Sequence, residues 1–108
     1  MMRGTEKKIY QFHAEFCKTF SHPIRLAIID LLRNGEKNVA ELQKELGIRQ
    51  TTISQHLAVL RRIGAVIARN EGRVVYYKLA DERIIKAYDM LDKVIKDIRT
   101  KEAKILAK

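Results

Sequence analysis

Residues 49–62, which read RQTTISQHLAVLRR, decide the fold of this chain. Ile53, Leu57 and Leu60 fall at i, i+4 and i+7, the spacing of one buried stripe on an α-helix. The opposite face carries hydroxyl and amide side chains and no acid, whereas an ordinary surface helix presents Glu and Lys. Such side chains donate and accept hydrogen bonds, so they fit against base edges in a DNA major groove. A packing helix with an uncharged polar face is the alternative that this pattern leaves open.

The basic residues of the chain concentrate around this helix. Residues 49–78 contain six Lys and Arg and a single acid, Glu71. The hydroxyl and amide side chains are candidates to form hydrogen bonds with base edges, and the arginines are candidates to bind phosphates. The predicted DNA-binding residues are Arg49, Gln50, Thr51, Thr52, Ser54, Gln55, Arg61, Arg62, Arg69 and Arg73.

Composition agrees with a polyanionic partner. The chain has 108 residues, the size of one domain, a net charge of +9 and a pI near 9.9. No apolar run approaches the roughly 18 residues that span a membrane, and the first residues lack the apolar segment of a signal peptide. The single cysteine excludes an intrachain disulfide framework and fits a reducing compartment. We therefore expect one domain over residues 1–108 that acts in the cytoplasm, associated with the nucleoid, without a membrane partner.

Three helices are predicted before residues 50–63. The first covers about 5–20 with Thr5 as its N-cap. The second covers 23–33 and ends at a left-handed Asn34-Gly35 cap. The third covers 39–46, where Asn38 and Glu41 have the spacing of a capping box. Only residues 47–49 separate it from the 50–63 helix, which is the sequence form of a helix-turn-helix.

After Gly64 the apolar period changes from 3.6 to 2, which predicts a β-hairpin over residues 66–79. A three-residue loop, Asn70-Glu71-Gly72, joins the expected strands, and Val75, Tyr77 and Leu79 should face the core. A basic hairpin after a recognition-type helix is a wing. The predicted fold class is thus mostly α with a small β-hairpin wing, a winged helix-turn-helix.

The last helix is predicted over residues 81–103, and the end of the chain is expected to fray. Its apolar residues step 4-3-4-3, the spacing of a heptad seam. A domain of this size leaves little for that seam to cover, so we expect it, with the Phe face of the first helix, to form a homodimer. The predicted interface residues are Phe12, Phe16, Ile84, Tyr88, Leu91, Ile95 and Ile98.

In this order of elements the chain resembles the ArsR/SmtB family of small bacterial and archaeal repressors. The matching segments are SHPIRLAIIDLL at 21–32, VAELQKELG at 39–47, QTTISQHLAVLRRIGAV at 50–66 and GRVVYYKL at 72–79. The resemblance covers nearly the whole chain. It implies a homodimer joined through its first and last helices, with two winged helix-turn-helix units that bind a palindromic operator and repress transcription.

The chain departs from the family pattern at three places. Arg49 replaces the usual serine cap, which leaves open a later start of the recognition helix, at Thr51 or Thr52, with Arg49 reaching a phosphate instead. Residues 38–46 lack the paired cysteines of metal sensors, and residues 81–108 contain no His. We therefore expect no metal and no other cofactor, and the sequence does not identify an effector.

Other chemistry has little support. The chain has no Gly-rich phosphate loop and no Ser/His/Asp set in a recognisable context, so no enzyme is expected. His13 and Cys17 have the i, i+4 spacing at which two side chains can share a metal, but packing of Cys17 as a small hydrophobic residue beside His13 is the favoured explanation. Oxidation of Cys17 at a dimer interface is a second open possibility. His22 is predicted to start a helix, and His56 either to be partly buried or to contact DNA.

Three functions fit these features. The main prediction is a sequence-specific, DNA-binding transcription regulator, a repressor by resemblance. A chromatin-type protein would instead depend on phosphates and show little sequence preference. A winged helix that binds protein is the third, and it would not require so much positive charge around helix and wing.

Overall fold

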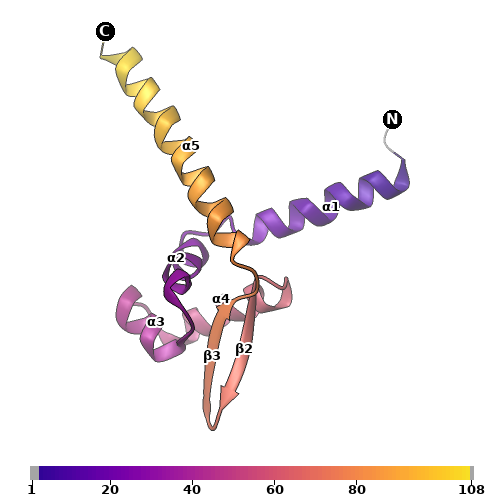
Figure 1. The fold of residues 1–108 in the computed structure, drawn as a ribbon, viewed down its shortest axis with the longest axis vertical. Helices are drawn as coiled ribbons and strands as arrows, with labels where there is room; N and C mark the ends of the chain where they lie inside the picture. Colours follow the sequence, from indigo (N-terminus) through magenta and orange to yellow (C-terminus); the bar gives the residue numbers. More distant parts are fainter. Residues whose placement is uncertain (1–2, 108) are drawn as a thin grey trace.

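A computed structural model describes residues 3–107, which form a winged helix-turn-helix body with two projecting helical arms (Figure 1). The sheet has three antiparallel strands in the order β1-β3-β2, so the predicted fold class is confirmed. No helix among the described residues is long and apolar enough to cross a membrane. In chain order the elements are α1 (Gly4–Thr19), α2 (Pro23–Leu31), the 3₁₀ helix η1 (Leu32–Asn34), β1 (Lys37–Asn38), α3 (Val39–Leu46), α4 (Gln50–Arg62), β2 (Val66–Glu71), β3 (Val74–Leu79) and α5 (Arg83–Leu106).

The core is small and centres on α4. Ile53, Leu57 and Leu60 of α4 are completely buried, as their spacing predicts. They pack against α2, α3 and the start of β2, while Tyr77 and Leu79 of β3 cover the edge of the cluster. The other fully or nearly fully buried residues are Ile28, Ile29, Leu32, Leu42, Ala65 and Val66.

The helix-turn-helix is held by local caps. The Asn38 side chain accepts from the Glu41 N–H at 2.8 Å, and the Glu41 carboxylate accepts from the Asn38 N–H at 3.0 Å. The predicted capping box is therefore present. Gly47 ends α3 with a φ of +67°, a conformation that glycine adopts without steric cost.

The predicted start of α1 and the predicted end of α2 were wrong. Helix α1 begins at Gly4, because the Glu6 carboxylate accepts from the Arg3 N–H at 3.2 Å and leaves Thr5 inside the helix. Helix α2 ends at Leu31 in a 3₁₀ turn, and Gly35 has φ +124° and ψ 179° rather than left-handed helical values. Helix α4 begins at Gln50, the predicted first residue, even though no side chain caps it, and not at the alternative start near Thr51 or Thr52.

The wing also differs from its prediction. Glu71 pairs with Val74, so the first strand extends further than expected, the second begins one residue later, and only Gly72 and Arg73 form the loop. Gly72 has a φ of +62°, and a positive φ at the first loop residue alone is the pattern of a type II′ turn. The two-residue strand β1, which pairs Lys37 with Tyr77 and Asn38 with Tyr76, carries no sequence signal because it is too short for alternation.

Helices α1 and α5 leave the body in different directions and contribute no buried residue (Figure 1). The Asp81 side chain accepts from the Arg83 N–H at 2.8 Å at the start of α5. The helix continues to Leu106, beyond the predicted end at residue 103.

Candidate nucleic-acid interface

Helix α4 presents the predicted base-reading residues to solvent. Because its apolar stripe is buried in the core, its other side is forced outward. The first turn contains no acid. Gln50, Thr51, Ser54 and Gln55 are exposed, and Thr52 is half-buried. Hydroxyl and amide groups therefore line one outer face of a helix that the body holds rigidly.

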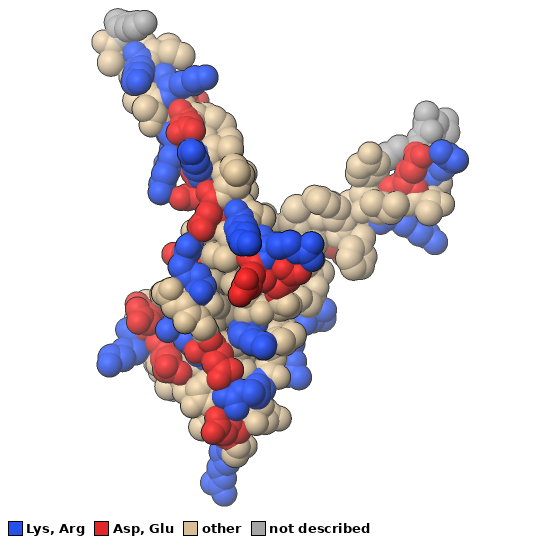
Figure 2. Space-filling model, viewed as in Figure 1, with Lys and Arg blue, Asp and Glu red and all other residues tan. Residues whose placement is uncertain are grey.

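The candidate phosphate ligands lie at both ends of α4 and on the wing. Arg49 precedes the helix, whereas Arg61 and Arg62 lie in its last turn, and all three are exposed. Arg73 is exposed in the two-residue loop at the hairpin tip. That tip, the lowest part of the molecule in Figure 2, ends in basic atoms.

Arg69, also predicted as a phosphate ligand, already has two acidic partners. Its guanidinium donates to the Glu36 carboxylate at 2.6 Å and 3.2 Å and to Glu71 at 3.1 Å. It also lies over the Tyr76 ring, 5.0 Å from the centroid. The hydrogen bond from Arg69 lowers the pKa of Glu36 below its ordinary value. Arg69 thus connects the wing to the loop before α3, a role that its sequence position did not suggest.

A histidine pair connects α4 to the start of α2. The Nδ1 atom of His22 accepts from the Ile24 N–H at 3.2 Å, so His22 caps α2 as predicted. Its ring lies 4.4 Å from that of His56, whose Nδ1 accepts from the Arg25 Nε–H at 3.1 Å. Burial, and secondly the charges of His22 and Arg25, lower the pKa of His56. His56 is therefore turned toward the protein.

An arginine fork connects the body to α5. The guanidinium of Arg33 donates to both carboxylate oxygens of Asp89, at 2.8 Å and 3.1 Å, and also to Asp30. These hydrogen bonds lower the pKa of Asp89. The pair of Arg33 with Asp89 could not be predicted from the sequence, because the two residues are 56 positions apart and no local pattern joins them.

The predicted dimer residues fall into two groups. Phe12 is 67% exposed, and Leu91, Ile95 and Ile98 are between 46% and 60% exposed. Phe16 and Ile84 instead pack at the edge of the chain's own core, and Tyr88 is half-buried, so burial raises its pKa. The outer parts of α1 and α5 thus carry apolar side chains that the described chain leaves uncovered.

Cys17 is exposed on α1, beside His13 on the same apolar face. Within residues 3–107 no three His, Cys, Asp or Glu side chains come together in a group that could hold a metal ion. His13 and Cys17 remain a pair without a third ligand in the described chain.

A second helix with an acid-free outer face, packed on a first helix and followed by a basic hairpin, defines a winged helix-turn-helix DNA-binding protein. Residues 22–68 match the bacterial regulatory proteins of the arsR family. The HTH-type transcriptional regulator Rv0081 of Mycobacterium tuberculosis is 34% identical over 91% of this chain and 87% of its own length. The chain belongs to the ArsR family. It is a DNA-binding transcription regulator, and this family is not enzymatic.

Solved structures share the fold over most of the chain. The crystal structure of Rv0081 matches with a TM-score of 0.82 at 34% identity. The match covers 88% of this chain and 96% of the Rv0081 chain. The structure of the transcriptional repressor BigR from Xylella fastidiosa matches with a TM-score of 0.73 at 35% identity. The match covers 87% of this chain and 96% of the BigR chain. The homodimeric winged helix-turn-helix domain of Mb0332 from Mycobacterium bovis has a TM-score of 0.80 at 29% identity, covering 90% of both chains.

Proposed function

We propose that this chain is a homodimeric, sequence-specific repressor that acts in the cytoplasm on nucleoid DNA as a single-domain protein. Each protomer inserts α4 into the major groove of one half of a palindromic operator. The observation that carries this proposal is the exposed face of α4, which combines hydrogen-bonding side chains with a complete lack of acids. The homodimeric relative from M. bovis and the repressor from X. fastidiosa support the assembly and the direction of regulation.

Base readout is assigned to the first half of α4. Gln50, Thr51, Ser54 and Gln55 are exposed there, and the N-terminal residues of a recognition helix are those that reach base edges. A glutamine side chain offers adenine a donor and an acceptor together, which gives Gln55 the largest expected discrimination. Thr52 lies at the margin of this face.

Phosphate binding is assigned to the arginines that flank this face, Arg49, Arg61 and Arg62, and to Arg73 at the wing tip. These contacts orient the protein on the duplex without reading sequence. Arg69 is assigned to holding the wing, because a phosphate contact would require it to leave Glu36 and Glu71.

The deciding experiment selects bound sequences from random duplexes at physiological salt. A palindrome with half-sites about one helical turn apart is expected, since twofold symmetry places one α4 in each half. Gln55→Ala should weaken binding to the selected site by about 1–3 kcal/mol and leave random DNA little affected. Equal losses on both duplexes would remove Gln55 from the base-reading set.

A chromatin-type binder is the second candidate, because the cations around α4 and the wing would serve it as well. A chromatin-type binder would enrich no sequence in the same selection. Its affinity for DNA would then depend on the salt concentration and not on the base sequence.

A further inference from the structure

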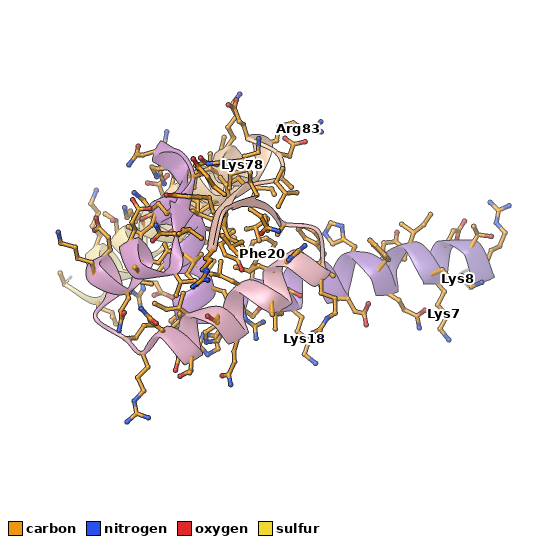
Figure 3. The ribbon with its side chains drawn as sticks, turned by 90° about the horizontal axis from the view of Figure 1, so that it is seen from below. Lys7, Lys8, Lys18, Phe20, Lys78 and Arg83 are labelled. Carbon is orange, nitrogen blue, oxygen red and sulfur yellow. The ribbon has the colours of Figure 1, made fainter. Side chains whose placement is uncertain are left out.

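We infer that the DNA-binding surface continues along one face of α1, which binds phosphates between the two half-sites. This face carries Lys7, Gln11, Glu15 and Lys18, which recur every three or four residues. Lys8 lies at its border with the Phe face, where it lines a hollow together with Phe12. In Figure 3 the three lysines lie on one side of α1, the side toward which α4 lies. With Lys8 at its border, the face has three cations and one acid, and it points in the direction of the proposed DNA surface.

A shared groove connects this face to α4. The groove runs between the ends of the two helices, where Lys18 and Glu15 of α1, Arg25 of α2 and Arg62 of α4 line it. The Arg25 guanidinium is held by His56 and by the Thr19 carbonyl, at 3.1 Å and 3.0 Å. Lys18 and Arg62 form no ion pair with any residue from 3 to 107. A phosphate bound by Arg62 is therefore next to a second cation.

The position of α1 decides which phosphates it reaches, and this step rests on the proposed dimer. Sixteen helical residues span about 24 Å, and α1 ends near the C-terminal end of α4, so its first turns project beyond that point. If the Phe face meets the partner, α1 lies close to the twofold axis and its lysines face the DNA between the half-sites. Lysine is a flexible point charge, suited to backbone binding without sequence preference.

The test is the triple variant Lys7→Gln/Lys8→Gln/Lys18→Gln, whose binding is measured against salt on the selected operator and on a random duplex. Each lost phosphate contact should reduce the slope of log K against log salt by about 0.9. The reduction should be similar on both duplexes, and the preferred sequence should not change. Phosphate-ethylation interference should show that the lost contacts lie between the half-sites.

The matched control is Lys86→Gln/Lys93→Gln/Lys104→Gln, which removes the same charge from exposed positions of α5, opposite its apolar seam. It should change the slope far less, because α5 points away from α4 (Figure 1). Equal slopes for the two triples would overturn the inference, since only net charge would then matter. The inference would also be overturned if the lysine triple variant were monomeric and kept the wild-type salt slope on random DNA. The lysines would then stabilise the dimer by pairing with acids of the partner and would not bind phosphates.

Failure of the proposed function would look different. If wild-type protein selected no sequence or sedimented as a monomer, the operator proposal would fail. The salt slopes of the two triples on random DNA would still decide whether α1 binds phosphates.

Discussion

Arg69 and Arg73 are four residues apart on the wing, yet their surroundings differ completely. Arg69 is shared between Glu36 and Glu71 and lies over Tyr76, whereas Arg73 projects from the loop. A guanidinium with two carboxylate partners contributes little net charge to a distant phosphate. The two arginines therefore provide a paired test of which one binds DNA.

Arg73→Gln should reduce the salt slope of DNA binding by about 0.9 for each phosphate contact removed, on any sequence. Arg69→Gln should leave the slope nearly unchanged, but faster amide exchange in β2 and β3 should show a looser wing. Filter binding over a salt series and hydrogen exchange separate the two effects. A larger slope change for Arg69→Gln would show that its ion pairs open on DNA.

The half-buried position of His56 predicts a pH dependence of stability. Because its pKa is lowered in the folded chain, the unfolded chain binds a proton more readily. The free energy of unfolding should thus fall as the pH drops below about 6.5, the pKa of an unperturbed histidine, and continue to fall until folded His56 is itself protonated. Protonation also removes the Nδ1 acceptor that Arg25 uses.

Urea unfolding at pH 7.5 and pH 5.5 tests this prediction. His56→Gln should reduce the difference in stability between the two pH values. His13→Gln, at an exposed position on α1, is the control and should retain the wild-type difference. An unchanged difference in His56→Gln would assign the pH dependence to other groups.

At the scale of the element, α3 and α4 show how far local rules extend. The capping box of α3 was predictable because both partners lie within one helical turn. Asn38→Ala should reduce the free energy of unfolding by about 1 kcal/mol, since it leaves the Glu41 N–H without its acceptor. Asn34→Ala, at an exposed position in η1, is the control for the urea unfolding measurement.

The start of α4 shows the limit of local rules. Arg49 cannot cap a helix, so the sequence left a later start open, but the helix begins at Gln50. Burial of Ile53, Leu57 and Leu60 stabilises the helix more than a missing cap costs. Leu57→Ala should accordingly lower the free energy of unfolding by about 2–5 kcal/mol, measured by urea unfolding, and more than Asn38→Ala does.

At the scale of the whole molecule, the two arms are the proposed homodimer interface. Leu91 is 60% exposed on the seam of α5, so Leu91→Asp would place an unpaired charge in the proposed interface. We expect this variant to sediment as a monomer and to lose operator binding. Met90→Asp, on the same helix beside the seam, should remain dimeric. A wild-type protein that is monomeric at micromolar concentration would contradict the proposed dimer.

The sequence alone determined the pattern of this protein: which helix faces are apolar, where the helix-turn-helix lies, and that a basic hairpin follows it. These features depend on residues within a few positions of one another, and periodicity records them directly. The family resemblance then indicated the function. The surface residues proposed to contact DNA could be nominated in the same way, because burial of one side of α4 exposes the other.

Only the tertiary structure decided which cations are paired and how the arms are held. Arg69 meets Glu36 across 33 residues, Arg33 meets Asp89 across 56, and Arg25 meets His56 across 31. It also brought Lys18 beside Arg62, two residues on different helices. An ion pair or hydrogen bond between distant residues depends on the folded path of the backbone, so no local pattern of sequence records it.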